Sequence, residues 1–172
     1  MTPKIQILQG DITEITADAI VNAANSSLLG GGGVDGAIHR YAGPKLYEEC
    51  LSLRNSNYKD GLPTGQAVAT KAYELDAKYI IHTVGPIYEQ DDISLLADCY
   101  NNSLLIAENL KCKSIAFPSI STGVFRVPIE VSAQTARKVI SDYKFKSIET
   151  VMLVLFNPWY QKTYKQIFED IS

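Results

Sequence analysis

Short apolar runs alternate with segments of helical periodicity along the whole sequence, and this alternation constrains the fold more than any other feature. A chain of 172 residues is long enough for one domain with its own core. Alternating strands and helices favour a mixed but largely parallel central sheet covered by helices on both faces, a three-layer α/β/α domain spanning residues 1–172. Strands are predicted at 4–9, 19–23, 66–70, 79–83, 114–117 and 151–156, and helices at 34–41, 44–53, 93–107, 128–143 and from 158 onward.

The composition is that of a folded domain with an acidic balance. Hydrophobic residues make up 46% of the chain and charged residues 20%, far from the regime of disordered proteins. The formal net charge of -3 argues against a protein that binds nucleic acid by neutralising many phosphates. An anionic ligand would therefore be held locally, by backbone N–H groups and helix N-termini.

The cysteines and the apolar runs indicate a reduced, intracellular protein. Cys50, Cys99 and Cys112 form an odd set without paired short spacing, which predicts neither a disulfide framework nor a metal centre. The first ten residues lack the pattern of a secretory signal, and the longest apolar run, 151–156, is far too short to span a bilayer. We expect a cytoplasmic protein without a membrane segment, metal ion or cofactor.

A glycine run between a strand and a helix is the clearest candidate for a ligand site. Asn22 and Asn25 lie near the end of the second strand, and Gly30 to Gly33 precede the helix at 34–41. Glycine lets backbone N–H groups approach an anion, and the helix N-terminus adds a favourable partial charge. Two common phosphate motifs do not explain the run. The GxGxxG match starting at Gly31 lacks the acidic residue expected about 20 positions later, and no Walker sequence follows.

Several polar residues have a structural interpretation beside a functional one. Asp35 falls in the first helical turn and His39 lies four residues later on the same face, so the pair can simply complement the helix dipole. The asparagines can form turns or caps. His82 lies within an apolar strand segment and is predicted to be a hydrogen-bonded core histidine outside the site.

A second loop, Ser119 to Phe125, follows the strand at 114–117 and precedes a helix that begins with a proline. Its glycine, Gly123, and its hydroxyl groups are suited to a second phosphate cradle. Phe125 is unusual in such a turn, and it either folds back into the core or faces a ligand.

Four stretches of the sequence together resemble one family. They are Gly10-Asp-Ile12, Asn22-Ala-Ala-Asn25 with the following Gly30-Gly-Gly-Gly-Val-Asp-Gly-Ala-Ile-His39, Ile81-His-Thr-Val-Gly-Pro86, and Pro118-Ser-Ile-Ser-Thr-Gly-Val-Phe125. This pattern is similar to that of macrodomains, in the MacroD-type group of ADP-ribosyl hydrolases and O-acetyl-ADP-ribose deacetylases. The resemblance implies the macrodomain fold, ADP-ribose as the ligand and hydrolysis of an ester as the reaction.

The resemblance also implies a role for each matching position. At the adenine end, Asp11 accepts a hydrogen bond from the exocyclic amine, Ile12 adds backbone contacts and Phe156 stacks on the base. At the distal ribose, Asn25 holds the sugar and Asp35 orients or deprotonates the attacking water. The remaining positions support the loops or contact the diphosphate and the adjoining ribose: Asn22, Gly32, Gly33, Val34, Ser121, Thr122, Gly123, Val124 and Phe125.

Other interpretations stay open at this point. Asp11 is equally suited to capping a turn after Gly10, and Phe156 to packing in the core. The implied substrates are proteins ADP-ribosylated on acidic side chains, O-acetyl-ADP-ribose and ADP-ribosylated nucleic-acid ends. Arg126 stands where related hydrolases usually carry glycine, which favours a second hypothesis, a reader that binds ADP-ribose without hydrolysis. A third hypothesis, binding of RNA through the adenine pocket, conflicts with the acidic charge.

Overall fold

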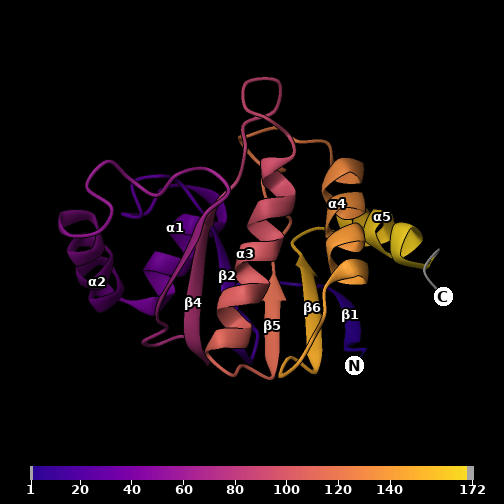
Figure 1. The fold of residues 1–172 in the computed structure, drawn as a ribbon, viewed down its shortest axis with the longest axis horizontal. Helices are drawn as coiled ribbons and strands as arrows, with labels where there is room; N and C mark the ends of the chain where they lie inside the picture. Colours follow the sequence, from indigo (N-terminus) through magenta and orange to yellow (C-terminus); the bar gives the residue numbers. More distant parts are fainter. Residues whose placement is uncertain (1, 170–172) are drawn as a thin grey trace.

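A six-stranded sheet forms the centre of the molecule (Figure 1). The computed structural model describes residues 2–169. The strand order is β1-β6-β5-β2-β4-β3, and every pair is parallel except β3 with β4, which confirms the mixed, largely parallel sheet. The strands are β1 (Lys4–Gln9), β2 (Ala17–Ala24), β3 (Ala67–Lys71), β4 (Ala77–Val84), β5 (Ser114–Phe117) and β6 (Thr150–Leu155).

Helices cover both faces of the sheet, as the sequence predicts. Successive side chains of a strand point to opposite faces, so Ile20 belongs to the core cluster that includes residues of α1 and α2, whereas Val21 belongs to the cluster that includes residues of α3, α4 and α5. Figure 1 shows α3 and α4 lying in front of the strands. None of the described helices is long and apolar enough to cross a membrane. The helices are α1 (Gly33–Ala42), α2 (Pro44–Asn55), α3 (Leu95–Asn109), α4 (Ile129–Asp142) and α5 (Pro158–Glu169), with a 3₁₀ turn η1 (Ile12–Glu14).

Capping groups explain several helix boundaries. Asn157 Oδ1 accepts a hydrogen bond from the backbone N–H of Tyr160 at 2.8 Å, so this residue is the N-cap of α5. Pro128 occupies the N-cap position of α4, one residue before the first helical turn in which we expected it. Asp11 caps η1 and accepts from the Thr13 N–H at 2.9 Å, which confirms the cap after Gly10 that the sequence left open.

The parallel strands direct their carboxyl ends to one edge of the sheet, the upper edge in Figure 1. The loops that follow β1, β6, β5 and β2 therefore lie along the same edge. At one end of this edge, Gly10 N donates to Leu155 O at 2.9 Å. This bond places Asp11 next to Phe156, although the two residues are far apart in the sequence.

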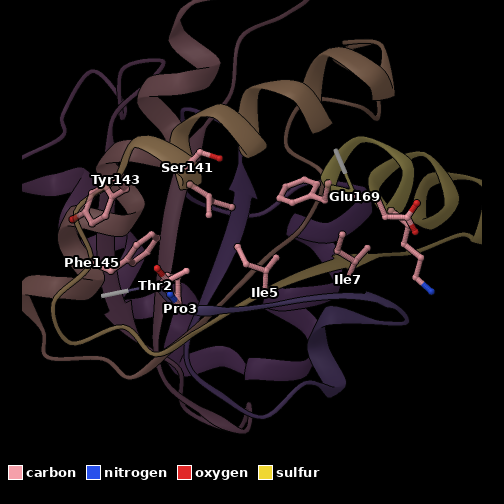
Figure 2. Close-up of a pocket in the computed structure, with 11 residues that line it drawn as sticks. Thr2, Pro3, Ile5, Ile7, Ser141, Tyr143, Phe145 and Glu169 are labelled. Carbon is pink, nitrogen blue, oxygen red and sulfur yellow. The ribbon is translucent and has the colours of Figure 1, made fainter. Parts of the chain in front are cut away.

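An open apolar groove of about 700 Å³ lies at the outer side of the sheet, between β1, α4 and α5 (Figure 2). Ile5 and Ile7 form its floor, and Phe145 and Phe168 are among its other apolar residues. None of the described residues that line this groove comes from the loops at the carboxyl ends of the strands. Ligands of parallel α/β sheets bind at those ends, so we place the candidate site there despite the larger volume of the groove.

The carboxylate of Glu108, on α3, fastens the segment that leads into β6. Burial alone would raise the pKa of this carboxyl, but hydrogen bonds from the backbone N–H groups of Ser147, Ile148 and Lys146 lower it below its ordinary value. The donors lie 2.8 to 3.2 Å from the carboxylate oxygens, and the Ser147 hydroxyl donates at 3.1 Å. Because the folded pKa is lowered, this stabilisation is full above the ordinary value of 4.5 and is lost as the pH falls through the lowered pKa.

We predict that Glu108→Gln lowers the free energy of unfolding by about 2 kcal/mol near neutral pH, because an amide nitrogen would replace an acceptor oxygen. The difference from wild type should shrink on acidification. Urea unfolding across a pH series measures both effects. Glu149→Gln, a change at an exposed neighbouring residue, is the control. A variant as stable as wild type at neutral pH would contradict the prediction.

Candidate functional site

A cleft of about 320 Å³ lies at the carboxyl ends of β2, β4 and β5, where the two glycine-containing loops meet. The first loop follows β2 and ends in α1, and the second follows β5. Gly85, directly after β4, lies between them. The lining residues are Ala23, Ala24, Asn25, Gly32, Gly33, Val34, Asp35, Gly85, Ser119, Ser121, Gly123, Val124 and Phe125.

The side chain of Asn25 braces the first loop. Its Nδ2 donates to Gly30 O at 2.8 Å, and its Oδ1 accepts from the Ser27 N–H at 3.0 Å and from the Ser27 hydroxyl. The loop then enters α1 with Gly32 at the N-cap and no capping side chain. Since the first N–H groups of a helix have no acceptor within it, the start of α1 presents them with a positive partial charge at the cleft.

The second loop is held in place by backbone hydrogen bonds. Ser121 O accepts from Val127 N at 2.9 Å, and Phe125 O accepts from Tyr88 N at 2.8 Å. Arg126 N donates to Gly123 O at 2.9 Å, and Arg126 has a φ of 64°. A left-handed backbone favours glycine, which gives a physical reason for glycine at this position in the family pattern. The Arg126 side chain is exposed.

Close packing of the second loop against β4 requires glycine at position 85. A Cβ atom there would lie 1.9 Å from Ser121 Oγ and 2.8 Å from Ile120 Cγ2. Gly32 and Gly123, on opposite loops, show the reverse: a Cβ on either would have no atom within 4 Å. Their backbones are therefore open to an incoming group.

Asp35 is the buried carboxylate of the cleft, with a residue exposure of 4%. Its Oδ1 accepts from Asn22 Nδ2 at 2.9 Å and lies 3.6 Å from His39 Nε2. Burial raises the pKa of Asp35, whereas the Asn22 hydrogen bond, His39 and the Asn25 backbone amide oppose the rise. Within residues 2–169, Asp35 Oδ2 has no hydrogen-bond partner. A buried carboxylate with a raised pKa and one unengaged oxygen is suited to accepting a proton.

Some of the residues that the sequence predicted for the site do not line the cleft directly. Asn22 is fully buried and reaches the cleft only through Asp35. The Thr122 hydroxyl lies 2.7 Å from Ser119 Oγ, inside the second loop. Conversely, the sequence analysis gave no role in the site to Gly85 or His39 and named Ser119 only as the start of the second loop, although Ser119 and Gly85 line the cleft and His39 lies beside Asp35. The four-residue spacing of Asp35 and His39 on one helix indicates that their side chains are adjacent, so this pair could have been found from the sequence.

Asp11, Ile12 and Phe156 lie further along the same edge of the sheet, beyond the cleft. Asp11 Oδ1 accepts from the Thr13 N–H and hydroxyl, and among the described residues none donates to Oδ2. Ile12 is buried, whereas Phe156 is 78% exposed, which excludes the alternative of a core residue. The described part of the chain contains no group of three or more His, Cys, Asp or Glu side chains placed to hold a metal ion.

The sequence matches one known protein family and is similar over nearly its whole length to named proteins of bacteria. The model of the Macro domain family matches residues 21–136. A macro domain-containing protein of Streptomyces griseus is 52% identical over 159 residues, which cover 91% of this chain and 90% of that protein. A Salmonella typhimurium protein named O-acetyl-ADP-ribose deacetylase is 45% identical over 172 residues, covering 97% of this chain and 95% of the other.

Solved structures show the same fold. The Oceanobacillus iheyensis macrodomain with ADP superposes with a TM-score of 0.91 at 44% identity, covering 94% of this chain and 88% of that one. A variant of that macrodomain, solved with ADPR, also has a TM-score of 0.91, at 43% identity and 97% and 91% coverage. The predicted macrodomain fold is therefore confirmed.

We predict that Gly85→Ala displaces the second loop, because the added methyl group would overlap the side chain of Ser121. The cost should be about 1–3 kcal/mol of stability. Amide NMR shifts should change across residues 119–127 and remain near wild type in β1. Gly10→Ala, where a Cβ would have no atom within 4 Å, serves as the control. Loop shifts and stability equal to those of the control would refute the close-packing argument.

Proposed function

This chain belongs to the Macro domain family, and we propose that it binds ADP-ribose and hydrolyses an ester bond at the distal ribose. The proposed substrates are proteins that carry mono-ADP-ribose on acidic side chains, O-acetyl-ADP-ribose, or both. One observation carries the proposal of hydrolysis: Asp35, a buried carboxylate with an unengaged oxygen, lies in the wall of the cleft between the two loops.

Backbone amides of both loops would hold the diphosphate. The first turn of α1 supplies N–H groups on one side, and the loop from Ser121 to Phe125 supplies them on the other. The open backbones of Gly32 and Gly123 allow phosphate oxygens to come close. Ser121 Oγ is buried without a hydrogen-bond partner in the described chain, so it is available as a donor.

The adenine would lie at the neighbouring end of the edge. Asp11 Oδ2 is available to accept the exocyclic amine, which adenine has and guanine lacks at that position. The exposed ring of Phe156, next to Asp11, offers a face for stacking. This placement supports the roles implied by the family resemblance, with both capping and adenine recognition assigned to Asp11.

The distal ribose would then lie beside Asn25 and Asp35. Water adds to the ester and loses a proton, which Asp35 accepts or directs. The bond between the acyl carbon and the ribose oxygen then breaks, and the leaving ribose oxygen takes up the proton that water gave. The products are a free ribose hydroxyl and a carboxylic acid. A raised pKa at Asp35 strengthens its carboxylate as a base near neutral pH.

A reader without hydrolytic activity is the second candidate, because Arg126 stands in the second loop where related hydrolases usually carry glycine. The deacetylase name of the Salmonella typhimurium relative and the geometry of Asp35 favour the enzyme. Incubation with a mono-ADP-ribosylated protein and with O-acetyl-ADP-ribose, side by side, decides between the two. Release of ADP-ribose supports hydrolysis. Binding of ADP-ribose without any release supports the reader.

We predict that Asp35→Ala lowers kcat at least about 100-fold and changes the Kd for ADP-ribose less than about threefold, because proton transfer matters chiefly in the transition state. Single-turnover kinetics and calorimetry measure the two quantities. In wild type, kcat should fall on acidification as Asp35 becomes protonated, at a higher pH than for an ordinary aspartate. Asp142→Ala, an exposed position on α4, is the control. Equal losses of turnover and affinity in Asp35→Ala would rule out this role.

A further inference from the structure

Three buried polar side chains form a continuous hydrogen-bonded row behind Asp35. Asn22 on β2, His82 on β4 and Thr70 on β3 come from three adjacent strands. Asn22 and His82 are direct partners in the parallel register, so their side chains point to the same face. His82 Nδ1 lies 3.1 Å from Asn22 Nδ2, and His82 Nε2 lies 2.9 Å from Thr70 Oγ1. These residues are 0 to 3% exposed.

Every hydrogen in this row can be assigned from Asp35 outward. An ionised carboxylate only accepts, so the Asn22 atom 2.9 Å from Asp35 Oδ1 is the amide nitrogen. The second hydrogen of that nitrogen points to His82 Nδ1, which must then be unprotonated. The ring proton of the neutral histidine is therefore on Nε2 and is donated to Thr70 Oγ1. The Thr70 hydroxyl donates in turn to Lys71 O at 3.1 Å.

We propose that His82 and Thr70 are positioning residues for the hydrolytic reaction. Thr70 fixes the Nε2–H tautomer of His82, the bare Nδ1 of His82 fixes the orientation of the Asn22 amide, and that amide holds Asp35. With the opposite tautomer, Nδ1–H would require the Asn22 oxygen to face it, and the same oxygen would then oppose the Asp35 carboxylate. This positioning role rests on the proposed function, since it takes Asp35 to be the group that acts on water.

The protonation states of the groups around Asp35 are consistent with this sequence of hydrogen bonds. Burial, together with the charge of His39, lowers the pKa of His82 to about 3, so His82 stays neutral at ordinary pH. From α2, Cys50 is an uncharged neighbour, because burial raises its pKa to about 12. His39 of α1 lies within 3.6 Å of Asp35 Oδ1. The Asn22 hydrogen bond is therefore one of two side-chain interactions that favour the ionised form of Asp35, the other being with His39.

Thr70→Val tests the row, because it removes the hydroxyl with little change of shape. Thr83→Val is the matched control: Thr83 is equally buried, one residue from His82, and its hydroxyl donates to Gln66 O at 2.9 Å, outside the row. Thr70→Ser, which restores a hydroxyl, should rescue the wild-type behaviour. Nitrogen-15 NMR of the ligand-free protein reports the tautomer of His82, and carbon-13 NMR reports the titration of the Asp35 carboxyl.

Wild type should show the Nε2–H tautomer. Thr70→Val should raise the pKa of Asp35 by about one unit and lower kcat about tenfold, with the Kd for ADP-ribose changed less than about twofold. The acid limb of its pH–rate profile should move to higher pH. An Nδ1–H tautomer in wild type overturns the proposal, and so does a Thr70→Val variant that matches Thr83→Val in both kcat and the Asp35 titration.

The two NMR measurements separate this inference from the proposed function. They need no substrate, so they test the row even in a protein that binds ADP-ribose without hydrolysing it. Absence of turnover in wild type would refute the proposed reaction, whereas an Nδ1–H tautomer of His82 in wild type would refute the positioning role whether or not the protein is an enzyme.

Discussion

A protein with a net negative charge must hold an anionic ligand through local groups, and in this chain backbone N–H groups gather at the carboxyl edge of the sheet. The net charge of -3 offers no general attraction for phosphate. The register of β2, β4 and β5 brings the start of α1 and the loop after β5 to the two sides of one cleft. Gly85 permits their close approach, since any side chain there would collide with Ser121. The rest of the site depends on this arrangement.

The same arrangement buries Asp35, and burial of a carboxylate is costly unless hydrogen bonds compensate for it. The amide of Asn22, on β2, offsets part of this cost with a hydrogen bond of 2.9 Å, although burial still raises the pKa of Asp35. His82 and Thr70 continue the hydrogen-bonded row behind Asn22. One oxygen of Asp35 is engaged in this way, while the other has no partner within the described residues. In the proposed reaction, the hydrogen-bonded oxygen would fix the orientation of the carboxylate and the unpartnered oxygen would act on water.

Local sequence predicted the elements well because their signals are local. The strands at Lys4–Gln9 and Ser114–Phe117 have the predicted bounds, and α5 begins at Pro158, as expected. The turn after Gly10 was left as one of two interpretations of Asp11, and its 3₁₀ geometry was not predicted, because three residues leave too short a periodic pattern. The family resemblance predicted both loops, including Asn25 and Asp35 as cleft residues. The pairing of Asn22 with His82 could not be predicted, since it arises from strand register between residues 60 positions apart.

The claim that backbone amides, rather than a cationic surface, hold the diphosphate is tested most directly by calorimetric titration of wild type with ADP-ribose at two ionic strengths. Salt screens interactions with exposed charges but has little effect on hydrogen bonds from backbone groups inside a cleft. We expect saturable heat with one site and a Kd that changes less than about threefold between low salt and about 0.5 M NaCl. Absence of heat, or a Kd that weakens about tenfold or more over that range, would contradict the claim.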